Sequence, residues 1–142
     1  MKGVTMRFAM LVALAITTGT ASGAVTSEQL DALYAEPSAF EIDIPKSAHI
    51  AESENAFAVH DIRPVAPIHI LVISKKRVPT VLQASPELIA EMIALATRVA
   101  KQEGLESDGF RLVINTHPLG GQSVYHLHVH VLGGRQMKWP PG

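Results

Sequence analysis

Three histidines occupy every second position near the end of the chain, in the stretch from Tyr125 to Leu132. The residues between His126, His128 and His130 are aliphatic, and alternation with a period of two is typical of a half-buried β-strand. Alternate side chains of a strand point to one face, so we expect the three imidazoles to share a face, about 7 Å apart. Imidazole is a donor, acceptor, base or metal ligand near neutral pH. We therefore predict that this strand carries the chemistry of the protein.

The loop before this strand adds groups that could bind an anion. Gly120 and Gly121 would let backbone N–H groups approach a charged ligand closely, and the Ser123 hydroxyl is a further donor. An ordinary turn that needs glycine would give the same pattern. Next to the histidines, however, the loop favours a site for a phosphate group.

Two kinds of chemistry are compatible with these histidines. In a metal site, two or three imidazoles would bind an ion such as zinc, with carboxylates nearby. The nearest acidic residue before His126 is Asp108 and none follows the strand, so any such carboxylate must come from elsewhere in the fold. In nucleophilic catalysis, one imidazole would attack phosphorus while its neighbours serve as acid, base and anion binders. The residues alone leave both possibilities open.

Periodicity predicts the elements that must position these groups. The clearest helix covers residues 86–103, where Ser85 is a suitable N-cap and one face is apolar. Residues 74–80 are interpreted as a solvated connector. Four strands are expected, at residues 56–62, 68–73, 110–115 and 125–132. The second of them is apolar almost throughout and is therefore predicted to be central.

The segment before residue 56 is less regular. Thr26 and Gln29 have the spacing of a capping box, which predicts a short helix from residue 26 to 35. A weak alternation further on suggests one short edge strand, around Phe40, Ile42 and Ile44. Short connections between successive strands favour antiparallel pairing. The predicted fold class is α+β, an antiparallel sheet of about five strands with a long helix on one face.

Composition and the N-terminus limit the function classes further. The 142 residues suit a single domain, and a net charge of −1 gives no electrostatic footprint for nucleic acid. The absence of cysteine excludes disulfides and thiolate chemistry. Residues 1–24 have the basic, apolar and small-residue regions of a signal peptide, too short to span a bilayer. We expect an exported protein, periplasmic or secreted; the alternatives are an N-terminal anchor or a cytoplasmic protein.

The chain resembles a known family at several separate motifs. The longest runs from Gly120 to Arg135 and continues into the tail Gln136 to Gly142. Three shorter ones lie upstream, namely His60-Asp61-Ile62, Ala66-Pro67-Ile68-His69 and Val113-Ile114-Asn115. Together they resemble the histidine triad (HIT) family, in particular its Hint branch. The resemblance covers residues 56–142, the expected domain core, and leaves residues 25–55 poorly matched.

The resemblance implies a hydrolase that cleaves nucleoside 5′-phosphoramidates through a nucleotidyl-histidine intermediate, without metal or cofactor. By position, His128 resembles the nucleophile and His126 and His130 its partners. His69 resembles a supporting fourth histidine. Ser123 would lie, with His130, near the phosphate and the leaving group.

The nucleotide site is implied in the same way. Asp61 would bind the ribose hydroxyls and Ile62 the base of a purine nucleotide such as AMP. The phosphate site would be completed by Asn115, Gly121, Gln122 and Ser123, beside His128 and His130. The family also implies a homodimer in which the tail with Trp139 approaches the partner's site.

Alternatives remain for the function and for single residues. A metal-dependent hydrolase using the same strand, or a purine nucleotide binder without catalysis, is compatible with these residues. His60 is interpreted as a residue of a strand face or pocket wall, and His49 and His117 as solvated loop histidines. Without the family, His69 would be a core histidine and Trp139 a frayed tail residue.

Overall fold

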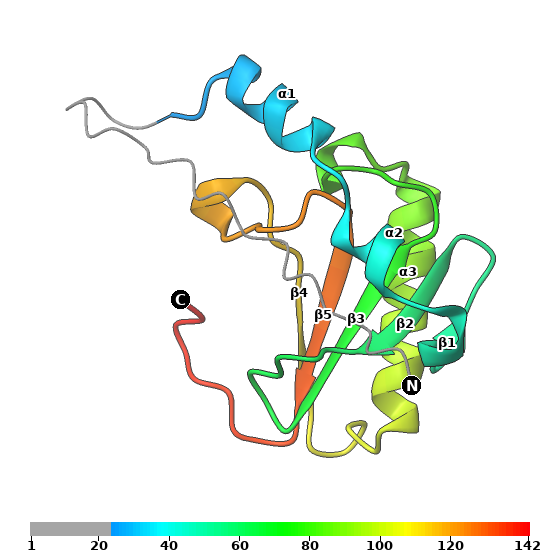
Figure 1. Ribbon diagram of the computed structural model, residues 1–142. Helices are drawn as coiled ribbons and strands as arrows, with labels where there is room; N and C mark the ends of the chain where they lie inside the picture. Colours follow the sequence, from blue (N-terminus) through cyan, green and yellow to red (C-terminus); the bar gives the residue numbers. More distant parts are fainter. Residues whose placement is uncertain (1–23) are drawn as a thin grey trace, which may run out of the picture.

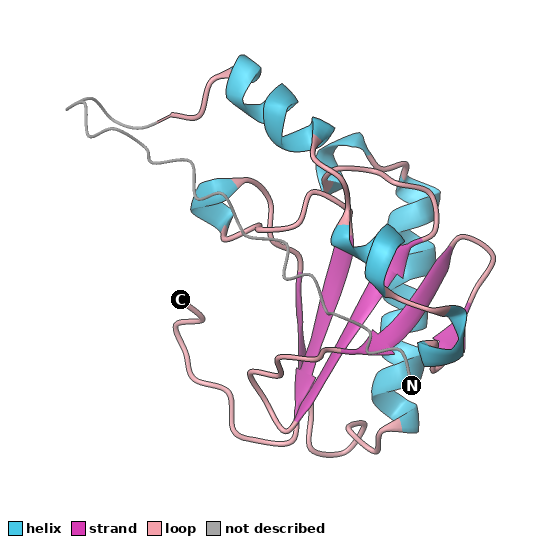
Figure 2. Ribbon diagram, in the orientation of Figure 1, coloured by secondary structure: helices cyan, strands magenta, loops and turns pink. Residues whose placement is uncertain are grey.

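The alternating segments of the chain form one antiparallel sheet, which a computed structural model describes within residues 24–142 (Figure 1). The strands are β1 (Ala51–Glu52), β2 (Ala56–His60), β3 (Ile68–Ser74), β4 (Phe110–Val113) and β5 (His128–Gly133), in the spatial order β1-β2-β3-β5-β4. The helices are α1 (Ser27–Ala35), α2 (Ala39–Asp43) and α3 (Pro86–Gln102), with short 3₁₀ turns η1 (Lys46–Ala48), η2 (Val81–Gln83) and η3 (Pro118–Gly120). Figure 2 shows α3 along one face of the sheet and α2 on the opposite side.

The main core lies between the sheet and α3. The Ser85 hydroxyl accepts a hydrogen bond from the Leu88 N–H, as expected for the N-cap, and the helix then turns its apolar face to the strands. The strand residues in this layer are Ala56, Ala58, Ile70, Val72, Val129 and Val131. The helix residues are Met92, Leu95, Ala96, Val99 and Ala100. Burial of this layer against α3 leaves the opposite sheet face available for a site.

That opposite face carries the histidines, because paired residues in antiparallel strands point to the same side. His128 pairs with Ile73, which pairs with Phe57, and His130 lies in the adjacent row. Phe40 of α2 and Ile44, which follows it, pack on the apolar part of this face. The histidine row remains uncovered by any long helix of the described chain.

The predicted fold class is confirmed, including the central position of β3 and the capping box of α1. The edge strand expected around Phe40, Ile42 and Ile44 is wrong, because this segment is α2. The Ser38 hydroxyl accepts from the Phe40 N–H and caps the helix, and the four-residue spacing of Phe40 and Ile44 puts both against the sheet. The sheet edge is instead formed by β1.

Two further expectations need correction. Regular β5 pairing begins only at His128, so His126 lies ahead of the strand. In the connector 74–80, Arg77 is half-buried, and its guanidinium donates to the carbonyls of Tyr34 and Glu36. The expected signal peptide lies, except for Ala24, outside the described residues. No helix within residues 24–142 is long and apolar enough to cross a bilayer.

Candidate active site

His69 and His130 form a hydrogen-bonded pair on the open face of the sheet. The Val65 N–H donates to His69 Nδ1 at 3.2 Å, so in neutral His69 the proton must be on Nε2. His69 Nε2 lies 2.9 Å from His130 Nδ1, which therefore accepts that proton's hydrogen bond. The proton of neutral His130 is then on Nε2, a nitrogen available to donate to a ligand.

His128 has the opposite tautomer. Its Nδ1 lies 2.7 Å from the carbonyl oxygen of His126, which can only accept, so Nδ1 carries the proton. Nε2 is consequently left with a free lone pair. The rings of Phe40 and His130 pack edge-to-face with the His128 ring, with ring centroids 5.1 and 4.9 Å away respectively. His128 thus has an unprotonated ring nitrogen, the form of imidazole that can attack an electrophile, with the His130 ring beside it.

The environment of His126, His128 and His130 favours the neutral imidazole in each of them. Burial lowers the pKa of His126 and of His128 from the ordinary value of 6.5. For His130, burial and then the positive charges that His128 and His69 can carry lower the pKa to about 4. At neutral pH, therefore, the lone pair of His128 does not have to be freed by loss of a proton.

His126 differs from the role expected for it, because its ring does not reach the open face. The side chain is buried, with Nε2 2.6 Å from the Ser74 carbonyl and Nδ1 2.8 Å from the Ser38 hydroxyl. The carbonyl fixes the proton on Nε2, so Ser38 donates to Nδ1. Both ring nitrogens are occupied, and His126 acts on His128 only through its backbone carbonyl. Sequence reasoning missed Ser38, which lies in the poorly matched segment and has no motif.

The loop before the histidines is closed by Gln122. The His117 N–H donates to Gln122 Oε1, and the Gln122 N–H donates back to the His117 carbonyl. The Gln122 amide nitrogen donates to the carbonyls of Pro79 and Val124. Gln122 is 6% exposed, so it braces from within the loop of residues 117–123, called the phosphate loop below for the role predicted from the sequence.

The other predicted phosphate ligands lie on the same loop or beside it. Gly121 has a positive φ of +80°, and a Cβ built on it would lie 4.0 Å from the Asn115 amide nitrogen. The structure thus brings Asn115 next to Gly121. Ser123 is exposed on the same loop, two residues further on.

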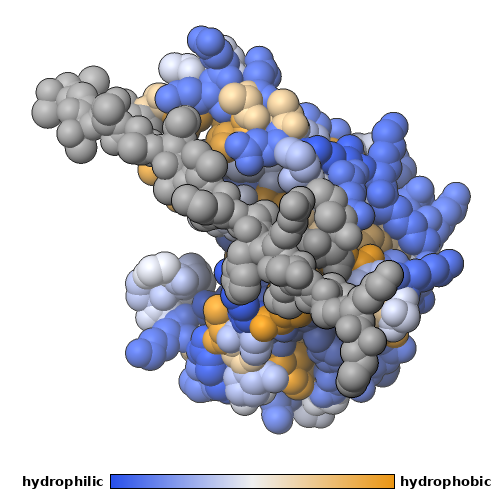
Figure 3. Space-filling view, in the orientation of Figure 1, coloured by the Kyte–Doolittle hydropathy of each residue, from blue (hydrophilic) through white to orange (hydrophobic). Residues whose placement is uncertain are grey.

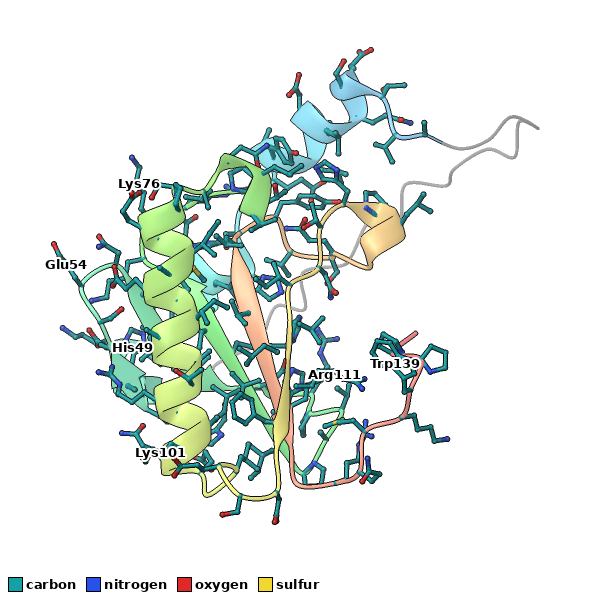
Figure 4. The ribbon with its side chains drawn as sticks, turned by 180° about the vertical axis from the view of Figure 1, so that it is seen from behind. His49, Glu54, Lys76, Lys101, Arg111 and Trp139 are labelled. Atoms are coloured by element: carbon teal, nitrogen blue, oxygen red, sulfur yellow. The ribbon has the colours of Figure 1, made fainter. Side chains whose placement is uncertain are left out.

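The predicted base and dimer contacts are exposed in the single chain. The Asp61 carboxylate lies 3.4 Å from His69 Nε2, which places it at the histidine pair, but Ile62 is 92% exposed. Trp139 is 85% exposed on the tail, which Arg111 holds through a 2.7 Å hydrogen bond to the Lys138 carbonyl. Figure 4 shows Arg111 directed toward this tail and Trp139 standing away from the sheet. Neither Ile62 nor Trp139 is brought against the histidines.

The remaining histidines correct two interpretations. His49 stacks on Phe57 with ring centroids 4.1 Å apart and is paired with Glu52, so it is not a solvated loop residue. His117 is also bound, 2.7 Å from the Tyr34 hydroxyl. His60 is more than half exposed and lies away from the triad, near Glu103.

A carboxylate does come close to the histidines, although none is near in the sequence. Ligand atoms of Asp61, His69 and His130 lie within 4.8 Å of one another. As they lie, however, the three do not fit a metal ion. His69 Nε2 and His130 Nδ1 are 2.9 Å apart and share a proton, whereas two nitrogens on one tetrahedral zinc are about 3.3 Å apart and both deprotonated. Binding would require the pair to separate and lose its hydrogen bond.

The chain is similar to known proteins over most of its length. The profile of the HIT domain matches residues 43–137. The 14 kDa zinc-binding protein of Zea mays is 49% identical over 105 residues, which cover 70% of this chain and 80% of the relative. Adenylylsulfatase HINT1 of Arabidopsis thaliana is 43% identical over 134 residues, covering 86% and 90% respectively. The crystal structure of a HIT family hydrolase from Legionella pneumophila has a TM-score of 0.67 and 45% identity, covering 73% of this chain and 95% of that one.

Proposed function

The chain belongs to the HIT family, and we propose that it hydrolyses nucleoside 5′-phosphoramidates through a nucleotidyl intermediate on His128. The observation that carries this proposal is the tautomer of His128, whose Nε2 keeps a free lone pair because Nδ1–H is held by the His126 carbonyl. The Legionella relative is named a hydrolase, which supports the reaction class.

In the first step, His128 Nε2 attacks phosphorus, the P–N bond breaks, and the amine leaves with a proton delivered from solvent past the exposed Ser123 hydroxyl. His130 Nε2–H donates to a non-bridging oxygen, and its own orientation is fixed by His69. In the second step, water attacks phosphorus and releases the nucleoside monophosphate. The His128–phosphorus bond breaks, Nε2 regains its lone pair, and a proton goes to solvent.

A second substrate class uses the same attack. One relative is named an adenylylsulfatase, and adenylyl sulfate would lose sulfate where a phosphoramidate loses an amine. Sulfate needs no proton to leave, so this substrate places less demand on a general acid. Both substrates should therefore form the same AMP adduct on His128.

The test is intact-protein mass measured shortly after mixing with an AMP phosphoramidate. We expect the mass of one nucleotidyl group on the wild type and none on His128→Ala. His60→Ala is a matched control because that histidine lies outside the site. Normal turnover by His128→Ala would refute the proposal. Affinity for AMP without release of any amine would identify a binder only.

The metal-dependent alternative has its own experiment. A Zea mays relative is named a zinc-binding protein, so the question applies to this chain. Because Asp61, His69 and His130 as they lie do not fit an ion, we expect full turnover after exhaustive chelation and no stimulation by added Zn²⁺. Activity that disappears on chelation and returns with Zn²⁺ would establish the metal enzyme instead.

We also propose a homodimer formed along the outer edge of β4. β4 ends the sheet, and no described strand pairs with its outer edge. A hollow of about 600 Å³ lies there, lined by residues that include Phe110, Arg111 and Met137, and the exposed Trp139 follows it in the chain. Light scattering should give twice the chain mass. A monomer with full activity would contradict this arrangement.

Export is proposed from the sequence of residues 1–24. The mass of the protein isolated from its host should lack these residues, and the protein should be found outside the cytoplasm. Full-length protein in the cytoplasmic fraction would contradict export, without affecting the proposed chemistry.

A further inference from the structure

His117 has a backbone conformation that glycine adopts far more readily than other residues. Its φ of 63° and ψ of 173° make it the one non-glycine residue with positive φ among those the structure describes. A side chain in this region strains the backbone, and such strain persists only where the surroundings hold it. Contacts around His117 must therefore hold this conformation.

The closed form of the phosphate loop depends on the backbone conformation of His117. The His117 carbonyl accepts from the N–H groups of Gly120 and Gln122, both at 3.1 Å, while the His117 N–H donates to the Gln122 side chain. These bonds close the loop into a compact turn that leads to Ser123. If His117 relaxed to an ordinary φ, its N–H and carbonyl would rotate and these bonds would break.

Tyr34 holds it. The Tyr34 hydroxyl lies 2.7 Å from His117 Nε2, and the same ring packs on Tyr125 at 5.7 Å, one residue before the triad. Arg77 donates to the Tyr34 carbonyl at 2.9 Å. Tyr34 thus touches the phosphate loop, the connector after β3 and the start of the histidine segment.

The helix that carries Tyr34 has little other function in packing. None of the residues of α1 is fully buried, and only Leu30, Leu33 and Tyr34 are partly covered. Figure 1 shows α1 at the end of the molecule on the side of the η3 turn. The described face in Figure 3 is mostly hydrophilic around this helix, with small hydrophobic patches between polar residues. Hydrophobic burial of α1 is therefore limited, and the hydrogen bonds of Tyr34 add to its attachment.

We propose that Tyr34 is a positioning residue, whose hydroxyl holds His117 in its glycine-like conformation and thereby fixes the phosphate loop beside His128. The proposal rests on the proposed function, because it assigns Tyr34 a role in that reaction. α1 then supports the active site through Tyr34. It also explains how a histidine can occupy a backbone position that favours glycine.

The decisive experiment combines two substitutions. Tyr34→Phe removes only the hydroxyl and should lower kcat/KM for an AMP phosphoramidate five- to tenfold. His117→Gly removes the strain, so it should be nearly silent alone and should restore Tyr34→Phe to within about twofold of wild type. Tyr125→Phe is the matched control, because its hydroxyl has no hydrogen-bond partner within residues 24–142. Equal loss in Tyr34→Phe and in the double variant would overturn the proposal.

A second measurement separates this inference from the proposed function. Amide hydrogen exchange at Gly120 and Gln122 reports loop closure whether or not the chosen substrate is cleaved. Exchange should be at least about tenfold faster in Tyr34→Phe and should return toward wild type in the double variant. If the wild type cleaves no phosphoramidate, the proposed function fails and exchange alone decides the role of Tyr34. Unchanged exchange in Tyr34→Phe would refute that role.

Discussion

Ser38→Ala should lower the free energy of unfolding by more than the loss of an exposed serine hydroxyl would. The Ser38 hydroxyl donates to His126 Nδ1 at 2.8 Å, and both side chains are 2% exposed. Water cannot easily replace the lost donor, and a buried acceptor without a partner costs about 1–3 kcal/mol. The same oxygen caps α2 by accepting from the Phe40 N–H, a contribution of about 1 kcal/mol. The expected loss is therefore about 2–4 kcal/mol.

Thermal unfolding measures this directly. For a domain of this length, 1 kcal/mol corresponds to about 3–4 °C, so Tm should fall by roughly 6–16 °C. Ser38→Thr keeps the hydroxyl and should retain most of the stability. Ser47→Ala, at an exposed serine nearby, should leave Tm within about 2 °C of wild type.

The activity of Ser38→Ala should fall as well, measured at a temperature where the variant is folded. The His126 ring would lose one of its two anchors, and the carbonyl that orients His128 belongs to that residue. We expect kcat to fall with KM little changed, because the orientation of the nucleophile matters most in the transition state. A Tm within about 2 °C of wild type would refute the account of a buried Ser38–His126 bond.

Three further predictions concern His130, Gly134 and Asp61. His130 has a pKa of about 4 when folded against 6.5 ordinarily, so below pH 6.5 the unfolded chain takes up a proton that the folded chain does not. Its contribution to stability is full above pH 6.5 and is lost as the pH falls toward 4; urea midpoints across this range should drop, and His130→Gln should flatten the decline. Gly134→Ala should lower the free energy of unfolding by about 1–3 kcal/mol in urea titrations, because φ at Gly134 is +84° and the new Cβ would lie 2.9 Å from Pro67 Cβ. Gly120→Ala is the control: its new Cβ would meet nothing within 4 Å, and the free energy of unfolding should change by less than about 0.5 kcal/mol. Asp61→Asn keeps an oxygen to accept from the Arg63 N–H but loses the charge, and should raise KM about tenfold in steady-state assays with kcat little changed.

Local sequence patterns predicted most of the elements that surround the site. The N-cap Ser85, the capping box at Thr26 and the apolar run of β3 are interactions between neighbours in the chain, and each was found as expected. The edge strand predicted around Phe40 was wrong because weak alternation over a few residues is also compatible with a helix. There the hydroxyl of Ser38 selects the helix.

The sequence by itself determined the chemistry available to this protein. The histidines at alternate positions, the glycines before them and the lack of cysteine depend on no distant contact. Periodicity also predicted that the histidine strand would be half-buried, since alternate residues of a strand point to opposite faces.

Only the tertiary structure decided what each histidine does. Alternation predicted that the three imidazoles share a face, but a tautomer depends on which group meets each nitrogen. The His126 carbonyl, only two residues away, meets His128. The groups that meet the other histidines come from distant segments: Ser38 and Ser74 meet His126, and Val65 meets His69, the partner of His130. The same holds for Tyr34, which reaches His117 across 83 positions of the chain. No local pattern contains these contacts, because they arise only when the sheet and the helices have packed.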